Sequence, residues 1–103
     1  MNTILCNAFS INMLADSASV AFSRIENPAQ HLAGGFVSAV GHADTARVFS
    51  SELGLNVPVN RVNVALDDET ILVVGQYKGP RLTEGATSLP EGSVIEWWLV
   101  ATQ

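Results

Sequence analysis

An unbroken apolar run from Ile71 to Gly75 constrains the fold of this chain more than any other feature, because it carries no charged or polar side chain. Such a run is typical of a central strand that is covered on both faces of a sheet. Other strand-like segments lie at residues 3–9, 18–25, 36–40, 61–66 and 94–100. The segment 61–66 alternates apolar and polar side chains, and residues 67–69 after it resemble a hairpin turn.

Two helices are predicted between the strands. Asn27-Pro28 is a strong helix start, because Asn caps helix N-termini and Pro is tolerated in the first turn, and Gly34-Gly35 ends this helix. Residues 43–53 have the apolar spacing of a second helix, which Gly54 ends. We therefore predict an α/β fold for the single domain 1–103, with a mixed β-sheet of about five to six strands flanked by two or more helices.

The composition predicts a folded protein. The chain has 103 residues, of which 48% are hydrophobic and 15% charged, and this is too apolar for a disordered chain. No apolar run approaches the ~20 residues that span a bilayer. The N-terminus also lacks the basic region and apolar stretch of a signal peptide. We therefore expect a cytoplasmic protein that does not contact a membrane.

Charge and cysteine content narrow the classes of partner. Ten acidic and five basic residues give a net charge of −5, which argues against long DNA or RNA, since these need a basic footprint. A small anion held by backbone N–H groups and one or two arginines is compatible with this charge. The single Cys6 forbids an intrachain disulfide and cannot form a thiolate metal site alone.

His42 is the first candidate for chemistry. It follows the strand predicted at 36–40 and opens the helix predicted at 43–53, which places it at the carboxyl edge of a sheet and beside a helix N-terminus. Ligand sites of α/β sheets lie at that edge, and helix N-termini attract anions. An imidazole there can donate or accept a proton near neutral pH. A histidine that caps the helix or lies on the surface is the structural alternative, which the spacing alone favours.

Arg81 and Glu84 lie in a long loop. Residues 78–92 contain three glycines, two prolines and no apolar period, and loops of this length in small domains are usually functional or disordered. A cation and a carboxylate three residues apart could clamp a phosphate and position a hydroxyl. Without further information, a solvated loop pair is the better interpretation, since exposed pairs contribute under ~1 kcal/mol.

Other motifs that carry chemistry are missing from the sequence. No His, Cys, Asp or Glu grouping has metal-ligand spacing, and no glycine-rich phosphate loop is present, so we predict no metal and no cofactor. Ser10 lacks the surroundings of a catalytic serine, and we interpret His31 as structural or solvent-facing. Trp97 and Trp98 point to opposite faces of a strand, so we expect one in the core and the other at the surface or in an interface.

Four short motifs, in order along almost the whole chain, resemble a small viral protein family. They are Asn7-Ala8-Phe9-Ser10-Ile11-Asn12-Met13-Leu14, Val40-Gly41-His42 before a short helix, Asn60-Arg61-Val62, and Arg81-Leu82-x-Glu84-Gly85. The family is the viral ring nucleases, also called type III anti-CRISPR proteins, which include the B116-like proteins of archaeal viruses. The opening octapeptide is highly specific, and the ordered set is a stronger match than any one motif.

The resemblance implies a homodimer that binds cyclic tetra-adenylate, the second messenger of type III CRISPR defence. Members of the family cleave this ring without metal to linear di-adenylates that end in a 2′,3′-cyclic phosphate, which silences the defence. The resemblance implies that His42, Arg81 and Glu84 are the catalytic residues. It implies ligand contacts from a further set of residues, namely Asn7, Ala8, Phe9, Ser10, Asn12, Gly41 and Gln76. Residues 76–80 depart from the archaeal-virus members, because they are longer and richer in Gly and Pro.

The chemistry implied by this resemblance uses the ribose 2′-hydroxyl of the substrate as the nucleophile. We assign His42 as the general acid on the departing 5′-oxygen and Arg81 as the group that offsets charge on the phosphorane. Glu84 would orient or deprotonate the 2′-hydroxyl. Two other hypotheses stay open. A dimer could sequester a cyclic nucleotide without cutting it, which the altered residues 76–80 motivate, or a protein-interaction factor could dock through the exposed tryptophan.

Overall fold

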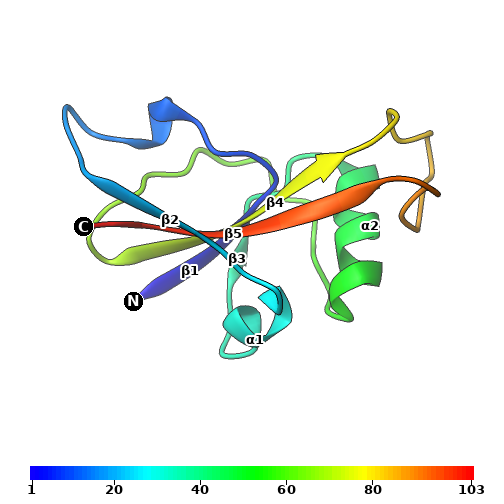
Figure 1. Ribbon diagram of the computed structural model, residues 1–103, viewed down its shortest axis with the longest axis horizontal. Helices are drawn as coiled ribbons and strands as arrows, with labels where there is room; N and C mark the ends of the chain where they lie inside the picture. The colour runs from blue at the N-terminus through cyan, green and yellow to red at the C-terminus, as the bar shows by residue number, and fades with distance from the viewer.

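The computed structural model describes all residues 1–103, and one five-stranded sheet forms its centre (Figure 1). The strands lie in the order β2-β5-β4-β1-β3. Along the chain, the elements are β1 (Asn2–Cys6), the 3-10 helix η1 (Ile11–Met13), β2 (Val20–Arg24), α1 (Pro28–Leu32), β3 (Val37–Ser38), α2 (Ala43–Leu53), β4 (Thr70–Lys78) and β5 (Val94–Thr102).

The sheet contains both parallel and antiparallel pairs. β1 runs parallel to β3 and to β4, whereas β5 runs antiparallel to β4 and to β2. β4 contains the apolar run 71–75 and occupies the middle position of the sheet, between β5 and β1. The predicted α/β fold with a mixed sheet is therefore confirmed, and so is the central place of the apolar run.

The strand predicted at residues 61–66 is wrong. This segment lies outside the sheet, and its backbone makes one hydrogen bond, from the Leu66 N–H to the Met13 carbonyl at 2.8 Å. The alternation holds in part, because Val64 and Leu66 pack into the core beneath the sheet, whereas Val62, on the same side of the predicted strand, is 50% exposed. A segment that crosses a sheet face buries every second side chain as a paired strand does, so alternation could not separate the two. The turn at 67–69 joins this segment to β4 and closes no hairpin.

The helices match their predicted positions closely. α2 spans the predicted residues 43–53, and Gly54 after it adopts the left-handed backbone (φ +67°) that often ends a helix. α1 begins at Pro28 as predicted and ends at Leu32. Asn27 makes no side-chain hydrogen bond to α1, so the expected asparagine cap is wrong. Neither helix has the length and apolar character that crossing a membrane requires.

Each face of the sheet has its own apolar core. The helices α1 and α2 cover one face (Figure 1), where the buried side chains come from both helices and from the sheet: Leu5, Leu32, Val40, Ala46, Phe49, Leu53, Val57 and Val73. The other face has no helix over it, apart from the short η1. The chain after β1 and the segment before β4 cover part of that face, around Cys6, Leu66, Leu72, Val74 and Val100.

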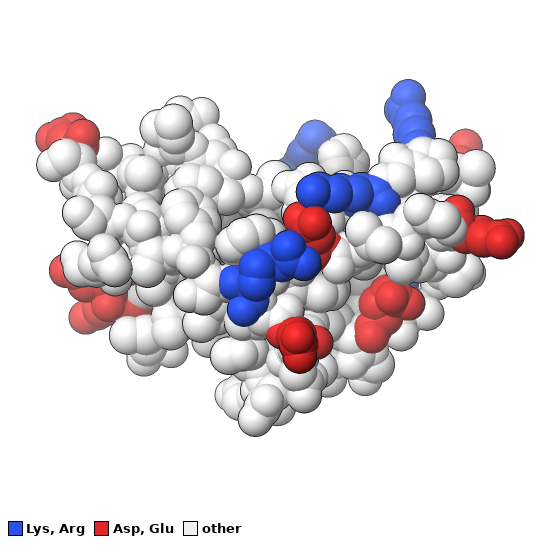
Figure 2. Space-filling view, in the orientation of Figure 1, with Lys and Arg blue, Asp and Glu red and all other residues white.

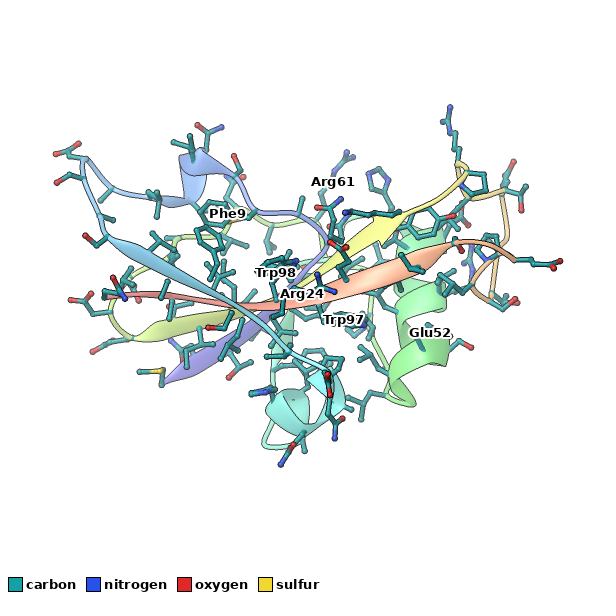
Figure 3. All side chains as sticks on the ribbon, in the orientation of Figure 1. Phe9, Arg24, Glu52, Arg61, Trp97 and Trp98 are labelled. Carbon is teal, nitrogen blue, oxygen red and sulfur yellow. The ribbon has the colours of Figure 1, made fainter.

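The two tryptophans of β5 face opposite sides of the sheet, as predicted. Trp97 packs against the helix-covered core, with its ring centre 5.0 Å from that of Phe49. Trp98 packs on the other face, where the Arg24 guanidinium lies over its ring at 5.2 Å (Figure 3). Both indoles are half-buried, so the expected contrast between a core and a surface tryptophan is wrong.

Candidate functional site

Three chain segments leave the sheet at one edge. Because β1, β3 and β4 are parallel, their carboxyl ends point the same way, and Figure 1 shows the exits of β1 and β4 close to the start of α2. β1 ends at Cys6 and β3 at Ser38, before the predicted ends at residues 9 and 40. The residues that follow therefore belong to this edge, where α/β sheets place ligand sites.

His42 is the residue immediately before α2, with an extended backbone (φ −124°, ψ 133°). Its side chain makes no hydrogen bond to the helix, so the alternative of a capping side chain is wrong. The alternative of a surface histidine is confirmed, because the residue is exposed. The unpaired backbone N–H groups of the first turn of α2 make this helix end attractive to anions. The imidazole is therefore free to exchange a proton with a ligand that lies at this helix end.

The three predicted catalytic residues meet in one cavity. His42, Arg81 and Glu84 line a hollow of about 680 Å³ together with Asp44, Thr45, Tyr77, Gly79 and Leu82. These residues come from the start of α2, the end of β4 and the loop between β4 and β5. An imidazole, a guanidinium and a carboxylate from distant parts of the sequence thus share one cavity.

Glu84 occupies a tight turn in the loop between β4 and β5. The Ala86 N–H donates to the Thr83 carbonyl at 3.0 Å, and Gly85 has φ +82°, which favours glycine at this place in a turn. The Gly85 N–H donates to Oδ1 of Asp44 on α2 at 3.0 Å. The carboxylate of Glu84 is therefore carried by a closed turn that contacts the helix beginning at His42.

Two arginines of the site have no carboxylate partner. Arg61 and Arg81 have no carboxylate oxygen within 4.0 Å, whereas the other basic residues, Arg24, Arg47 and Lys78, are all paired. Figure 2 shows basic side chains over the centre and one half of the molecule, while the opposite end carries acidic side chains only. Two unneutralised guanidiniums near a helix N-terminus make an anionic ligand the best match for this edge.

Arg61 lines no cavity but lies beside the residue that precedes His42, and the sequence analysis gave it no role. A Cβ placed on Gly41 would lie 3.4 Å from Arg61 Cγ, so the arginine side chain packs against the residue before His42. Asn60 fixes this position, because its N–H donates to the Val40 carbonyl at 2.8 Å. The sequence signal that could have identified Arg61 is the Asn60-Arg61-Val62 motif, which belongs to the family resemblance. Gly41 itself lines no cavity.

Four of the predicted ligand residues lie in a second cavity of about 530 Å³, namely Asn7, Ala8, Ser10 and Asn12. Ser10 also starts η1, because its hydroxyl accepts the Asn12 N–H at 3.2 Å. Asn63 lines the same cavity from the segment before β4, and the sequence analysis missed this residue too. No charged side chain lines the cavity. Its amide and hydroxyl groups suit neutral polar groups such as a ribose or a base.

The remaining predicted ligand residues, Phe9 and Gln76, lie in a third cavity of about 280 Å³. Phe22 and Trp98 are among its lining residues, and the Phe9 and Phe22 rings meet edge to face with their centres 5.3 Å apart. The predicted ligand residues therefore do not gather in one cavity of a single chain. They divide between the neutral polar cavity and the aromatic cavity, and none of them lines the hollow of His42, Arg81 and Glu84.

The thiol of Cys6, the single cysteine of the chain, is buried and unreactive. Cys6 is 2% exposed, and burial raises the pKa of its thiol to about 11, so the sulfur stays protonated at neutral pH. No three His, Cys, Asp or Glu side chains lie close enough together to hold a metal ion.

Comparison with known proteins identifies the family and the fold of the chain. The profile of the STIV B116-like family matches residues 3–95, a range that includes all four motifs. B116 of Sulfolobus turreted icosahedral virus shares the fold, with a TM-score of 0.82 over 98% of this chain and 99% of that chain, at 24% identity. Uncharacterized protein 26 of Sulfolobus islandicus filamentous virus (isolate Iceland/Hveragerdi) is 36% identical over 61 residues, which are 59% of this chain and 45% of that protein.

Proposed function

Because the chain belongs to the STIV B116-like family, as its four motifs predicted, we propose that it is a metal-independent ring nuclease. It opens cyclic tetra-adenylate into linear di-adenylates and so antagonises type III CRISPR signalling. The observation that carries the proposal is the shared cavity of His42, Arg81 and Glu84 at the N-terminus of α2. This set supplies an acid, a base and a positive charge around one phosphodiester.

The reaction is an internal transfer that consumes no water. The 2′-oxygen of one ribose attacks the neighbouring phosphorus, and its proton passes to Glu84. The bond from phosphorus to the 5′-oxygen breaks, and His42 gives a proton to that oxygen, which becomes a 5′-hydroxyl. Arg81 offsets the charge of the pentacoordinate phosphorus. Positioning of the 2′-hydroxyl supplies much of the rate, and the acid contributes roughly 10²–10⁴-fold.

Binding of the ring depends on local groups. The chain has a net charge of −5, so long-range attraction for four phosphates is absent. The unpaired Arg61 and Arg81 and the N–H groups at the start of α2 supply the positive potential at short range. The neutral cavity lined by Asn7 and Ser10 is suited to the ribose and adenine groups, which carry no charge.

We infer that two copies of the chain hold one ring. No helix covers the open face of β2, β5 and β4, where Phe22 is 51% exposed and Trp98 half-buried. Beside them, Arg24 and Lys78 pair with Glu96 at 3.6 and 3.1 Å, so both signs of charge are present in this patch. A two-fold axis brings the same patch together from both copies. It also matches a ring with four equivalent linkages, of which each His42 cuts one.

The test is incubation of the purified protein with cyclic tetra-adenylate in the presence of EDTA, followed by separation of the products. We expect di-adenylates with a 2′,3′-cyclic phosphate. The His42→Ala variant should bind the ring as wild type does and cleave it at least about 100-fold more slowly. His31→Ala is the matched control, because His31 is the other histidine of the chain, is exposed on α1 and makes no hydrogen bond. Intact ring after long incubation with micromolar wild-type protein contradicts the proposal.

The same assay separates the alternatives. Tight binding of the ring without product would support a sequestering dimer. A complex with a host protein that survives the double variant His42→Ala, Arg81→Ala would support an interaction factor. Cleavage is favoured over both because a protein that only binds the ring has no need of an exposed imidazole beside a carboxylate in the same hollow.

A further inference from the structure

We propose that Asp44 and Arg47, on the first turns of α2, are positioning residues that hold the turn carrying Glu84 beside His42. The inference rests on the proposed function, because it concerns how the catalytic hollow is assembled. Neither residue is assigned a role by the motifs that identify the family. We call the contact between these two side chains and the turn Thr83–Ala86 the latch.

The latch consists of three hydrogen bonds. Oδ1 of Asp44 accepts the Gly85 N–H at 3.0 Å and also accepts from Nη2 of Arg47. Nε of Arg47 donates to the Ala86 carbonyl at 3.3 Å. The two side chains lie three residues apart on one face of the helix. Together they bind the N–H of Gly85 and the carbonyl of Ala86 in the turn.

The loop has few other connections. Apart from the latch, residues 79–92 are joined to the rest of the chain near their two ends. The Tyr77 hydroxyl donates to the Pro80 carbonyl at 2.5 Å, and the N–H (3.1 Å) and hydroxyl of Ser93 donate to the Pro90 carbonyl. The Ala86 N–H closes the turn internally on the Thr83 carbonyl. Between these two ends, the hydrogen bonds that tie the turn to the rest of the chain are those of the latch, so the latch decides where the turn lies.

The position of Glu84 follows from the latch. Glu84 directly precedes Gly85, whose N–H is held by Asp44, and Asp44 is two residues from His42. A carboxylate fixed on the turn therefore stays at the hollow that His42 lines. Without the latch, the carboxylate and imidazole would sample many separations, and productive geometry would become rare.

A purely structural role predicts something different. An exposed Asp–Arg pair spaced i,i+3 on a helix contributes little to stability, and an acid in the first helical turn favours the helix by its charge alone. Neither effect involves the Gly85 N–H. The distinguishing variant is therefore Asp44→Asn, which loses the charge but keeps an oxygen that can accept from Gly85.

The experiment measures motion and cleavage in the same variants. ¹⁵N relaxation gives the order parameter of the Gly85 N–H, which we expect to fall from about 0.8 in the wild type to below about 0.6 in Asp44→Ala. The single-turnover cleavage rate should fall about tenfold or more in Asp44→Ala and Arg47→Ala, with the affinity for the ring changed much less. Asp44→Asn should recover part of both losses. Glu52→Gln, an exposed acid on the same helix without an ion pair (Figure 3), should change neither.

The outcomes distinguish this inference from the proposed function. An unchanged order parameter at Gly85 in Asp44→Ala overturns the latch. A mobile Gly85 combined with a wild-type cleavage rate overturns its role in positioning Glu84. If the wild-type chain does not cleave the ring at all, the proposed function fails, whereas a mobile Gly85 in Asp44→Ala still supports the latch.

Discussion

Gly75 lies so close to the indole of Trp97 that a Cβ on the glycine would stand 2.6 Å from Trp97 Cζ3. The same atom would stand 2.7 Å from Cζ of Phe49 on α2. The central strand β4 thus presents bare backbone where these two aromatic rings meet. The glycine at the end of the apolar run is required by the core of the protein, because no side chain fits there.

Gly75→Ala should therefore destabilise the protein. An extra methyl group in a packed core forces rings and backbone apart, and we expect the free energy of unfolding to fall by about 1–3 kcal/mol. Urea denaturation followed by tryptophan fluorescence measures this change. Gly34→Ala is the control, because a Cβ at Gly34 meets nothing within 4 Å. The free energy of unfolding of this variant should stay within about 0.5 kcal/mol of the wild-type value. Equal midpoints for the two variants would show that the core relaxes around the added methyl group.

Each subunit should carry a complete catalytic set. His42, Arg81 and Glu84 line one hollow of one chain, so mixing His42→Ala protein with Glu84→Ala protein should restore no activity. If each hollow took His42 from one subunit and Glu84 from the other, a dimer of one His42→Ala chain and one Glu84→Ala chain would contain one hollow with both residues intact. Cleavage by the mixture above the sum of the two variants, after exchange of subunits, would rule out the single-chain arrangement.

Arg61 should contribute to affinity. Its guanidinium has no carboxylate partner and its stem packs beside Gly41. We expect Arg61→Gln to raise the Kd for cyclic tetra-adenylate by about tenfold or more, since charged hydrogen bonds to phosphate are strong. The dependence of Kd on salt concentration should also become weaker. Arg61→Lys, which keeps the charge, should retain part of the affinity. Wild-type binding by Arg61→Gln would remove this residue from the site.

The open face should be the dimer contact. Phe22→Glu places a charge in the patch around Trp98, and we expect it to convert dimers into monomers in sedimentation experiments. Val37→Glu is the matched control, because Val37 is 54% exposed and Phe22 51%, and Val37 lies on β3 at the opposite edge of the sheet. Dissociation by Val37→Glu with an intact Phe22→Glu dimer would move the contact to β3.

Stability should depend on pH through Glu96. A hydrogen bond from Lys78 and the nearby charges of Lys78 and Arg24 lower the pKa of this carboxyl below its ordinary value of 4.5. A carboxyl whose pKa is lower in the folded state stabilises the fold above its unfolded pKa, and the contribution is lost as the pH falls through the folded value. In Glu96→Gln, the unfolding free energy should therefore decline less below pH 4.5 than in wild type. Glu52→Gln should follow the wild-type curve.

The sequence predicted the elements whose signals were redundant. The helix at 43–53 was correct at both ends, because apolar spacing and Gly54 agree on it. The apolar run 71–75 correctly marked the centre of the sheet. The prediction of a strand at 61–66 was wrong, because alternation of apolar residues indicates which side chains are buried. It does not indicate whether the backbone pairs with a neighbouring strand through hydrogen bonds.

The candidate site was predictable in part. The place of His42 followed from a strand, a short step and a helix in succession, which is local information. That Arg81 and Glu84 share its cavity came from the family resemblance, since nothing local connects a loop 40 residues away to α2. The division of the predicted ligand residues between two cavities, both separate from the hollow of His42, depends on how the chain after β1 folds over the sheet, and no motif encodes this.

The antiparallel pairing of β4 and β5 continues in register from Ile71–Ala101 to Lys78–Val94, and the loop starts only beyond this last pair. Insertions or deletions between those two residues therefore leave the ladder and both cores unchanged. Evolution can thus alter the wall of the catalytic hollow by changing the length of a single connection. Under the proposed function, chains that share this sheet could in this way come to accept messengers of different circumference.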